Sequence, residues 1–186
     1  MVEPGNLTKV TAHMVSSLDG YIAAKDNRVE WMNSKDRFDQ GVTLSKEEIT
    51  AFLENIDCYV MGSRTYEHAL ELGWPYGDTP VYVFTKRSLP KKYPNVHFLT
   101  GDLNQVMQTQ LKSDHCNIWV VGGSNLIRQF IQFGLVDELI VTIVPVILGD
   151  GQPFFESIEK EQPLHLKNVR AYTNGMVELT YSFQLR

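Results

Sequence analysis

Cysteine is scarce in this chain, which has only two cysteines among 186 residues. Cys58 and Cys116 are isolated from each other, and Cys58 lies inside an apolar run. A disulfide framework or a cysteine-based metal site requires more cysteines at closer spacing. We therefore expect two buried, reduced thiols.

Long hydrophobic runs are also missing. Apolar stretches such as 139–148 are much shorter than the roughly 18–20 residues that span a bilayer, and Pro145 interrupts this one. The first six residues, MVEPGN, have neither a basic start nor an apolar core. We expect no membrane segment, no signal peptide and a cytoplasmic location.

The chain has no excess of positive charge and no cluster of metal ligands. It has 17 basic and 22 acidic residues, a net charge of −5, which does not favour a nucleic-acid partner. The histidines lack the i, i+4 pairing or the neighbouring acids that metal sites use, so we expect no metal. They are His13, His68, His97, His115 and His165. The strand pattern around His13 favours a hydrogen-bonded core residue over a catalyst.

What is present is ordinary globular composition, with 43% hydrophobic and 21% charged residues, which favours one domain over residues 1–186. Hydrophobic periodicity alternates between the periods of strands and helices. The expected strands are 9–17, 21–24, 57–62, 80–85, 96–99, 118–121, 136–146, 164–172 and 176–185. The expected helices are 46–56, a helix that begins near 63, 103–111 and 125–134.

This alternation predicts an α/β fold with a mostly parallel sheet, and Asn174-Gly175 predicts an antiparallel hairpin at its C-terminal end. Ser45 and Glu48 form a capping-box pattern. Ser63 is a candidate cap for the next helix.

The segment Ile118–Ile127 combines a buried strand, two glycines and a helix. Helix first turns carry unpaired N–H groups, and glycine lets an anion approach the backbone closely. Gly122 and Gly123 are therefore a candidate phosphate cradle. A tight turn without a ligand remains the alternative, because the third glycine of the dinucleotide fingerprint is absent.

Three strand ends of this kind should meet at one edge of the sheet, where ligands bind in open α/β sheets. Arg64, Lys86 and Arg87 lie at these ends and could pair with the additional phosphate that distinguishes NADPH from NADH. The three segments are 62–65 (GSRT), 85–88 (TKRS) and 122–125 (GGSN).

Three motifs, in this order and spacing, resemble dihydrofolate reductase and the reductase domain of riboflavin biosynthesis. They are 17–23 (SLDGYIA), 61–67 (MGSRTYE) and 121–124 (VGGS). Segment 145–155 (PVILGDGQPFF) is more similar to the riboflavin branch. The resemblance covers nearly the whole chain and implies a three-layer sandwich with a mostly parallel, eight-stranded sheet, NADPH as cofactor and a homodimer.

The resemblance also implies roles for the residues of these motifs. Ile22 and Ala23 would border the nicotinamide. The adenosine side and phosphates would be held by Gly62, Ser63, Arg64 and Thr65, the 2′-phosphate by Thr85, Lys86 and Arg87, and the pyrophosphate by Gly122, Gly123, Ser124, Asn125 and Leu126.

A catalytic acid is implied by the same resemblance. Segment 31–36 (WMNSKD) resembles the folate-reductase stretch in which a tryptophan precedes the acid by five residues, which indicates Asp36. An exposed acid at a helix start is the alternative reading. Asp19 is the second candidate, although Asp-Gly more simply makes a turn.

The zinc-deaminase pattern that is often fused to the riboflavin reductase is absent from this sequence. We therefore expect the reductive step alone, with a pteridine-like or ribosylaminopyrimidine substrate. True dihydrofolate reduction and a non-catalytic nucleotide-binding dimer are the alternatives.

Two loop features leave their roles open. Trp74 and Tyr76 suit either stacking on a planar substrate or packing of their own loop. Segment 149–151 suits either a turn or a loop closing over the substrate, with Phe154 and Phe155 packing behind it.

Overall fold

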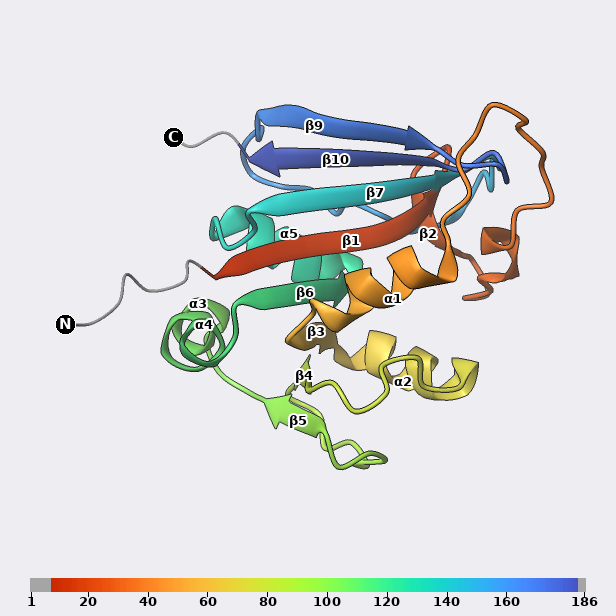
Figure 1. Ribbon diagram of the computed structural model, residues 1–186. Helices are drawn as coiled ribbons and strands as arrows, with labels where there is room; N and C mark the ends of the chain where they lie inside the picture. Colours follow the sequence, from red (N-terminus) through yellow and green to blue (C-terminus); the bar gives the residue numbers. More distant parts are fainter. Residues whose placement is uncertain (1–7, 184–186) are drawn as a thin grey trace.

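Eight strands form one sheet in the computed structural model, which describes residues 8–183 (Figure 1). Their order is β5-β4-β3-β6-β1-β7-β10-β9. The strands are β1 (Lys9–Ser17), β3 (Cys58–Gly62), β4 (Val81–Phe84), β5 (Val96–Leu99), β6 (Asn117–Gly122), β7 (Glu138–Val144), β9 (Leu164–Ala171) and β10 (Val177–Phe183).

All neighbouring strands pair in parallel except β10, which is antiparallel to both β7 and β9. The expected mostly parallel sheet with a C-terminal hairpin is therefore confirmed. The turn between β9 and β10 contains Gly175, whose φ of 76° suits glycine.

Helices cover both faces of this sheet, which gives the expected three layers (Figure 1). One face carries α1 and α2, and the other carries α5 and the segment from α3 to α4. The helices are η1 (Glu30–Met32), α1 (Lys46–Glu54), α2 (Ser63–Leu72), α3 (Leu103–Val106), η2 (Met107–Leu111), α4 (Lys112–Asp114) and α5 (Ser124–Gln132).

The two faces of the sheet have separate hydrophobic cores. The larger core packs α3, η2 and α5 against the central strands and includes the fully buried Phe130 and Met107. The smaller core packs α2 against β3, β4 and β5, around Tyr66 and Trp74. These cores fix the central strands, so the ends of β3, β4 and β6 lie at one edge.

Local signals at helix starts are confirmed at two of three positions. The Ser45 hydroxyl accepts from the Glu48 backbone, and the Glu48 carboxylate accepts from the Ser45 backbone, so the capping box is complete. The start of 103–111 is also confirmed, with Asp102 as its side-chain cap. Ser63 is not a cap, because α2 begins at that residue and Gly62 is the N-cap.

A short strand was missed. β8 (Gly151–Pro153) pairs antiparallel with β2 (Tyr21–Ala24) in a separate two-stranded sheet. Gly149 and Asp150 therefore form a bend that leads directly into β8, whose first residue is Gly151. This strand is only three residues long and pairs with a distant segment, so its sequence has no alternation of apolar and polar residues from which it could be predicted.

The expectation of two buried thiols is right for Cys58 and wrong for Cys116. Cys116 is exposed, because it precedes β6 at the edge of the sheet opposite the strand ends described above. Within residues 8–183 no helix is long and apolar enough to cross a bilayer. The first six residues and the end of expected strand 176–185 lie outside the described residues.

We predict that Ser45→Ala lowers the free energy of unfolding by about 1 kcal/mol, because the first turn of α1 loses its side-chain acceptor. None of the residues of α1 is fully buried, so packing compensates little. Urea denaturation monitored by circular dichroism measures the change. Lys46→Ala, at the next and equally exposed position, is the control and should leave stability nearly unchanged.

Candidate functional site

Two adjoining clefts open at the carboxyl edge of the sheet. The first, of about 500 Å³, lies between the ends of β4 and β5 and the start of α5, and we call it the anion cleft. The second, of about 740 Å³, lies between β1, β2 and α2, and we call it the acceptor cleft. Arg64, Thr65 and Gly123 line both, so the two clefts meet at these residues.

The anion cleft brings together nearly all the predicted cofactor residues. Those that line it are Gly62, Ser63, Arg64, Thr65, Thr85, Lys86, Arg87, Gly123, Ser124, Asn125 and Leu126. Ile22 and Ala23 line the acceptor cleft next to it, and their place beside a nicotinamide stays a prediction. Gly122 is the last residue of β6, directly before Gly123, and is not among the residues that line either cleft.

The helices that begin at the anion cleft have no side-chain caps. Gly62 is the N-cap of α2 and Gly123 is the N-cap of α5, and neither N-cap makes a side-chain capping hydrogen bond to the first turn of its helix. By contrast, α1 and α3 are capped by their own Ser45 and Asp102. First-turn N–H groups of α2 and α5 are therefore left for an external anion, and both helix dipoles favour negative charge there.

The backbone between β6 and α5 permits only glycine at its first position. Gly122 has a φ of 129°, and a Cβ there would approach the Met14 side chain to 3.2 Å. The Gly122–Gly123 peptide bond is cis. At Gly123 a Cβ would be in ordinary contact with the Thr65 hydroxyl, at 3.6 Å, and the Gln152 amide, at 3.5 Å, so the missing side chain leaves the backbone bare where the two clefts meet.

The β2–β8 sheet closes one side of the junction. The Ser124 hydroxyl, at the start of α5, donates to the Pro153 carbonyl, and the Gln152 amide donates to the Ser124 hydroxyl over 3.4 Å. Phe154 is buried in the larger core, while Phe155 is half exposed. The segment after β7 is thus anchored to the helix that faces the anion cleft.

Asp19 has a structural role in this anchoring. Its carboxylate accepts hydrogen bonds from the Ser17 hydroxyl at 2.6 Å, Gly149 N at 2.7 Å and Leu148 N at 3.1 Å. The bond from Ser17, and then those from Gly149 and Leu148, hold the pKa of Asp19 below its usual value. Asp19 lies in the turn that the Asp-Gly pair predicts, where Gly20 N donates to the Ser17 carbonyl. Its ionised carboxylate also ties this turn to the loop after β7.

The three predicted cations are not equivalent. Arg87 makes a bidentate ion pair with Glu67, at 2.7 and 2.8 Å, which lowers the pKa of the Glu67 carboxyl. Within residues 8–183, Arg64 and Lys86 have no ion pair. Glu67 on α2 therefore compensates the charge of Arg87 in this structure, and the pairing of Arg87 with a phosphate stays a prediction.

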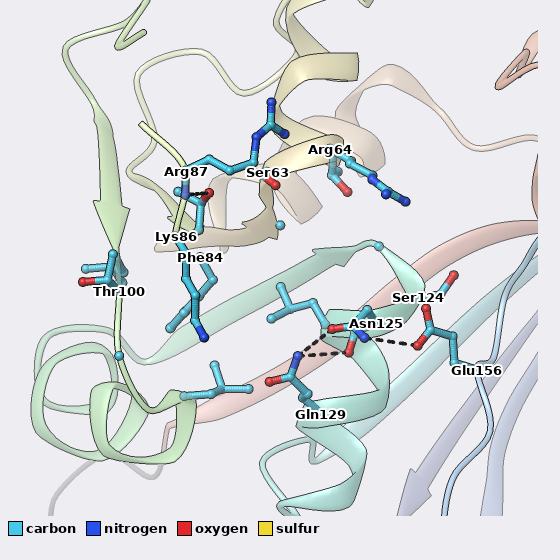
Figure 2. A pocket seen from close by; sticks show the side chains of 18 residues that line it. Ser63, Arg64, Phe84, Lys86, Arg87, Thr100, Ser124, Asn125, Gln129 and Glu156 are labelled. Carbon is cyan, nitrogen blue, oxygen red and sulfur yellow. Dashed lines mark hydrogen bonds between the residues drawn. The ribbon is translucent and has the colours of Figure 1, made fainter. Parts of the chain in front are cut away.

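Figure 2 shows how the remaining side chains are arranged around the anion cleft. Lys86 and Thr100, from the ends of β4 and β5, lie across from Asn125 and Gln129 on α5. Glu156 is the acidic group of this cleft and accepts from Asn125 Nδ2 and Arg128 Nε, both at 3.2 Å. Because these contacts hold Glu156 at the α5 side, the side of Lys86 is the more positive.

The acceptor cleft has a mainly apolar wall. Met14, Ile22, Val29, Met32 and Val121 contribute to it, together with the indole of Trp119. Polar side chains come from His13, Asn27 and Gln152, and from α2, where Arg64, Glu67, His68 and Glu71 share one face at helical spacing. A flat, largely apolar ring with a polar edge suits these walls.

His13 is only half satisfied, which corrects the expectation of a hydrogen-bonded core residue. Its ring stacks on Trp119, with 5.0 Å between centroids and 6° between planes, and its Nε2 lies 3.0 Å from the Thr142 hydroxyl. Its Nδ1 is buried and has no partner among the described residues. Burial lowers the pKa of His13 to about 4, so the ring is neutral near pH 7.

Asp36 lies away from both clefts. It is exposed, and its carboxylate packs against Gly175 in the β9–β10 turn. The backbone N–H of Asp36 donates to the Ser34 hydroxyl, which itself donates to the Asn174 carbonyl. The structure therefore does not bring Asp36 together with the other candidate residues, and its catalytic role stays a prediction without geometric support.

Aromatic residues that seemed candidates for substrate stacking have another role. Trp74 is buried and packs against Tyr66, Tyr76 and Tyr93, with 4.3 Å between the Trp74 and Tyr93 ring centroids. Trp74 and Tyr76 thus pack their own loop. The aromatic wall of the acceptor cleft is Trp119 instead, whose strand position looked simply buried.

Sequence reasoning also missed His68. One signal was available, because Arg64 and His68 are four residues apart and therefore share a face of α2. Nothing in the sequence alone indicated that this face turns toward a cleft.

Comparison with known proteins gives consistent matches. Residues 8–178 match the model of the RibD C-terminal domain. The uncharacterized protein YwjB of Bacillus subtilis (strain 168) is 32% identical over 178 residues, covering 93% of this chain and 97% of YwjB. The uncharacterized protein YyaP of the same organism is 27% identical, covering 93% of this chain and 94% of YyaP.

Solved structures share the fold. A "putative riboflavin biosynthesis protein" from Shewanella sp. PV-4 has a TM-score of 0.82 at 24% identity, covering 96% of this chain and all of that one. A deaminase/5-amino-6-(5-phosphoribosylamino)uracil reductase from Thermotoga maritima has a TM-score of 0.68 at 16% identity. This chain matches over 96% of its length and covers 57% of the Thermotoga protein.

We predict that the free energy of unfolding falls as the pH drops from about 6.5 to about 4. In this window the unfolded state binds a proton at His13 that the folded state does not, and the loss approaches about 3 kcal/mol at its lower end. Urea denaturation across the pH range measures it. The difference in the free energy of unfolding between wild type and His13→Phe, taken at each pH, isolates the contribution of this histidine. If the two proteins lose stability in parallel as the pH falls, the effect does not come from His13.

Proposed function

The chain belongs to the RibD C-terminal domain family, and on that premise we propose that it is an NADPH-dependent reductase of a flat heterocyclic substrate of the pteridine or ribosylaminopyrimidine type. The resemblance seen in its sequence motifs agrees with this family. The reductase activity is named for the Thermotoga relative, and we extend it to this chain from the arrangement of its clefts.

The observation that carries the proposal is the pair of uncapped helix starts facing one cleft. The first turns of α2 and α5 present unpaired N–H groups at the strand ends of β3 and β6, as a pyrophosphate requires. The bare backbone at Gly123, between Thr65 and Gln152, fits a group that approaches it closely. The residues present therefore fit a dinucleotide.

Within this proposal one cleft binds the cofactor and the other binds the substrate that is reduced. The anion cleft holds the phosphates, and Ile22 and Ala23 border the nicotinamide where the acceptor cleft begins. Bound NADPH supplies the hydride. The apolar wall and Trp119 orient the acceptor ring and exclude water from its face.

Dihydrofolate as the true substrate has less support. Among the described residues that line the acceptor cleft, the carboxylates are Glu67 and Glu71, both on α2. Glu67 is occupied by Arg87, and Asp36 is elsewhere. A reductase that recognises its acceptor mainly through uncharged groups agrees better with this cleft.

We also keep the homodimer and a cytoplasmic location as parts of the proposal. Support for self-association comes from the edge strand β9, where Leu166 is 46% and Val169 is 54% exposed. Exposed apolar side chains on an edge strand are suited to an interface.

The direct test is a thermal-shift titration with NADPH and with NADH, followed by measurement of NADPH oxidation with pterin and aminopyrimidine acceptors. A ligand that binds only the folded state adds about 2.7 kcal/mol at 100 times its dissociation constant, which is readily measured in a domain of this size. Stabilisation by NADPH above that by NADH supports the proposal. Absence of stabilisation by either would favour a fold that has lost its cofactor site.

We predict that Lys86→Met weakens NADPH binding at least tenfold and NADH binding less than twofold. Lys86 lines the anion cleft but not the acceptor cleft, and it has no ion pair among the described residues. It is therefore the cation best suited to the 2′-phosphate. Loss of a charge-assisted hydrogen bond of about 1.5–3 kcal/mol corresponds to roughly ten- to more than a hundredfold. Isothermal titration calorimetry measures both affinities.

Arg64→Met should act differently, because Arg64 lines both clefts and lies where the pyrophosphate and nicotinamide would meet. We predict similar losses for NADPH and NADH. Lys91→Met, on an exposed loop outside both clefts, is the control. If the Arg64 variant loses affinity for NADPH but not for NADH, and the Lys86 variant loses neither, then Arg64 and not Lys86 is the residue that contacts the 2′-phosphate.

A further inference from the structure

Two histidines of the acceptor cleft each have a buried ring nitrogen without a partner. They are His13 on β1 and His68 on α2, and the unpaired atoms are His13 Nδ1 and His68 Nε2. Within residues 8–183, these are the buried side-chain nitrogen and oxygen atoms left without a hydrogen bond. Both therefore belong to a single cleft, although their elements are far apart in sequence.

A buried polar atom without a partner has lost its hydrogen bonds to water and gained none in exchange, which destabilises the folded state. Folded proteins satisfy most such atoms, so two of them in the walls of one cleft need an explanation. A ligand that supplies the missing hydrogen bonds in the bound state is the simplest explanation. Met14 and Met32 form part of the same walls, and flexible methionine side chains adapt readily to a bound ligand.

The second nitrogen of each ring already has a hydrogen-bonding partner in the protein. His13 Nε2 contacts the Thr142 hydroxyl at 3.0 Å, and His68 Nδ1 lies 3.4 Å from the Glu71 carboxylate. The stacking on Trp119 further fixes the plane of His13. Each unpaired nitrogen is thus positioned by contacts on the other side of its ring, which is the usual way a protein orients an imidazole toward a ligand.

We propose that His13 and His68 bind the polar edge of the acceptor through these two nitrogens and so determine which heterocycles the cleft accepts. The proposal rests on the proposed function only in taking this cleft as the acceptor site.

His13 acts as a neutral hydrogen-bonding group. Thr142 permits either tautomer, because its hydroxyl both donates and accepts, so Nδ1 can face a ring N–H or a carbonyl. The low pKa of His13 means that near pH 7 it holds no extra proton to give to the substrate. It therefore selects and orients the ring, while the charged groups that share the cleft, Arg64, Glu67 and Glu71, lie on α2.

The test uses the full chain and lumazine, a flat heterocycle with ring nitrogens and carbonyls, as the probe. Its fluorescence is titrated against wild type, His13→Phe and His68→Phe, each with and without saturating NADP⁺. Phenylalanine retains a flat ring at each position and removes the nitrogens, so His13→Phe preserves the packing on Trp119. NADP⁺ affinity is measured for each protein in the same experiment.

We expect lumazine to bind wild type and to bind each variant at least tenfold more weakly, with NADP⁺ affinity unchanged within twofold. Nitrogen-15 spectra of the imidazoles give a second readout. The His13 and His68 signals should shift when lumazine is added, while those of the exposed His97 and His165 stay in place.

Equal lumazine affinity in wild type and both variants would overturn the inference. So would a wild-type protein that binds NADP⁺ but none of lumazine, dihydrofolate and 5,6-diaminouracil. A wild-type protein that binds lumazine through the histidines but does not bind NADP⁺ would support this inference and refute the proposed function. A variant that fails to fold is replaced by glutamine at the same position, which should retain part of the affinity through its amide.

Discussion

The site depends on two helices that start at glycine. Gly62 and Gly123 have no side chain to cap α2 and α5, and parallel pairing of β3 with β6 places both helix starts at one edge of the sheet. The unpaired N–H groups and the positive ends of two dipoles are thus concentrated in one cleft. The two helix starts together carry a partial charge equivalent to roughly one cation, delivered by backbone groups.

The charges around this backbone cradle refine its selectivity. Arg87 is neutralised by Glu67, and Glu156 is held on the α5 side of the cleft by Asn125 and Arg128. The remaining positive charge lies at Arg64 and Lys86, one at the junction of the clefts and one at the far end. An elongated anion with separated phosphates matches this distribution better than a single small anion.

The parts of the structure that were predictable from sequence are those with local causes. The capping box at Ser45 and the hairpin at Asn174-Gly175 require only neighbouring residues, and both formed as expected. β8 depends on pairing with β2, some 130 residues earlier in the chain, and the pairing of Arg87 with Glu67 depends on how α2 lies beside β4. His13 looked like a core residue because its strand pattern says nothing about whether Nδ1 finds a partner. The position of Asp36 follows from a long loop packing on a distant hairpin, which motif spacing does not encode.

Hydrogen–deuterium exchange with and without NADPH tests the central claim most directly, because it reports on individual backbone N–H groups. If the two helix starts hold the cofactor, NADPH should slow exchange at residues 63–65 and 124–126, while the side-chain-capped start of α1, at 46–49, is unchanged. Two results would contradict the account. One is protection confined to other segments, and the other is exchange at both helix starts that is the same with saturating NADPH as without it.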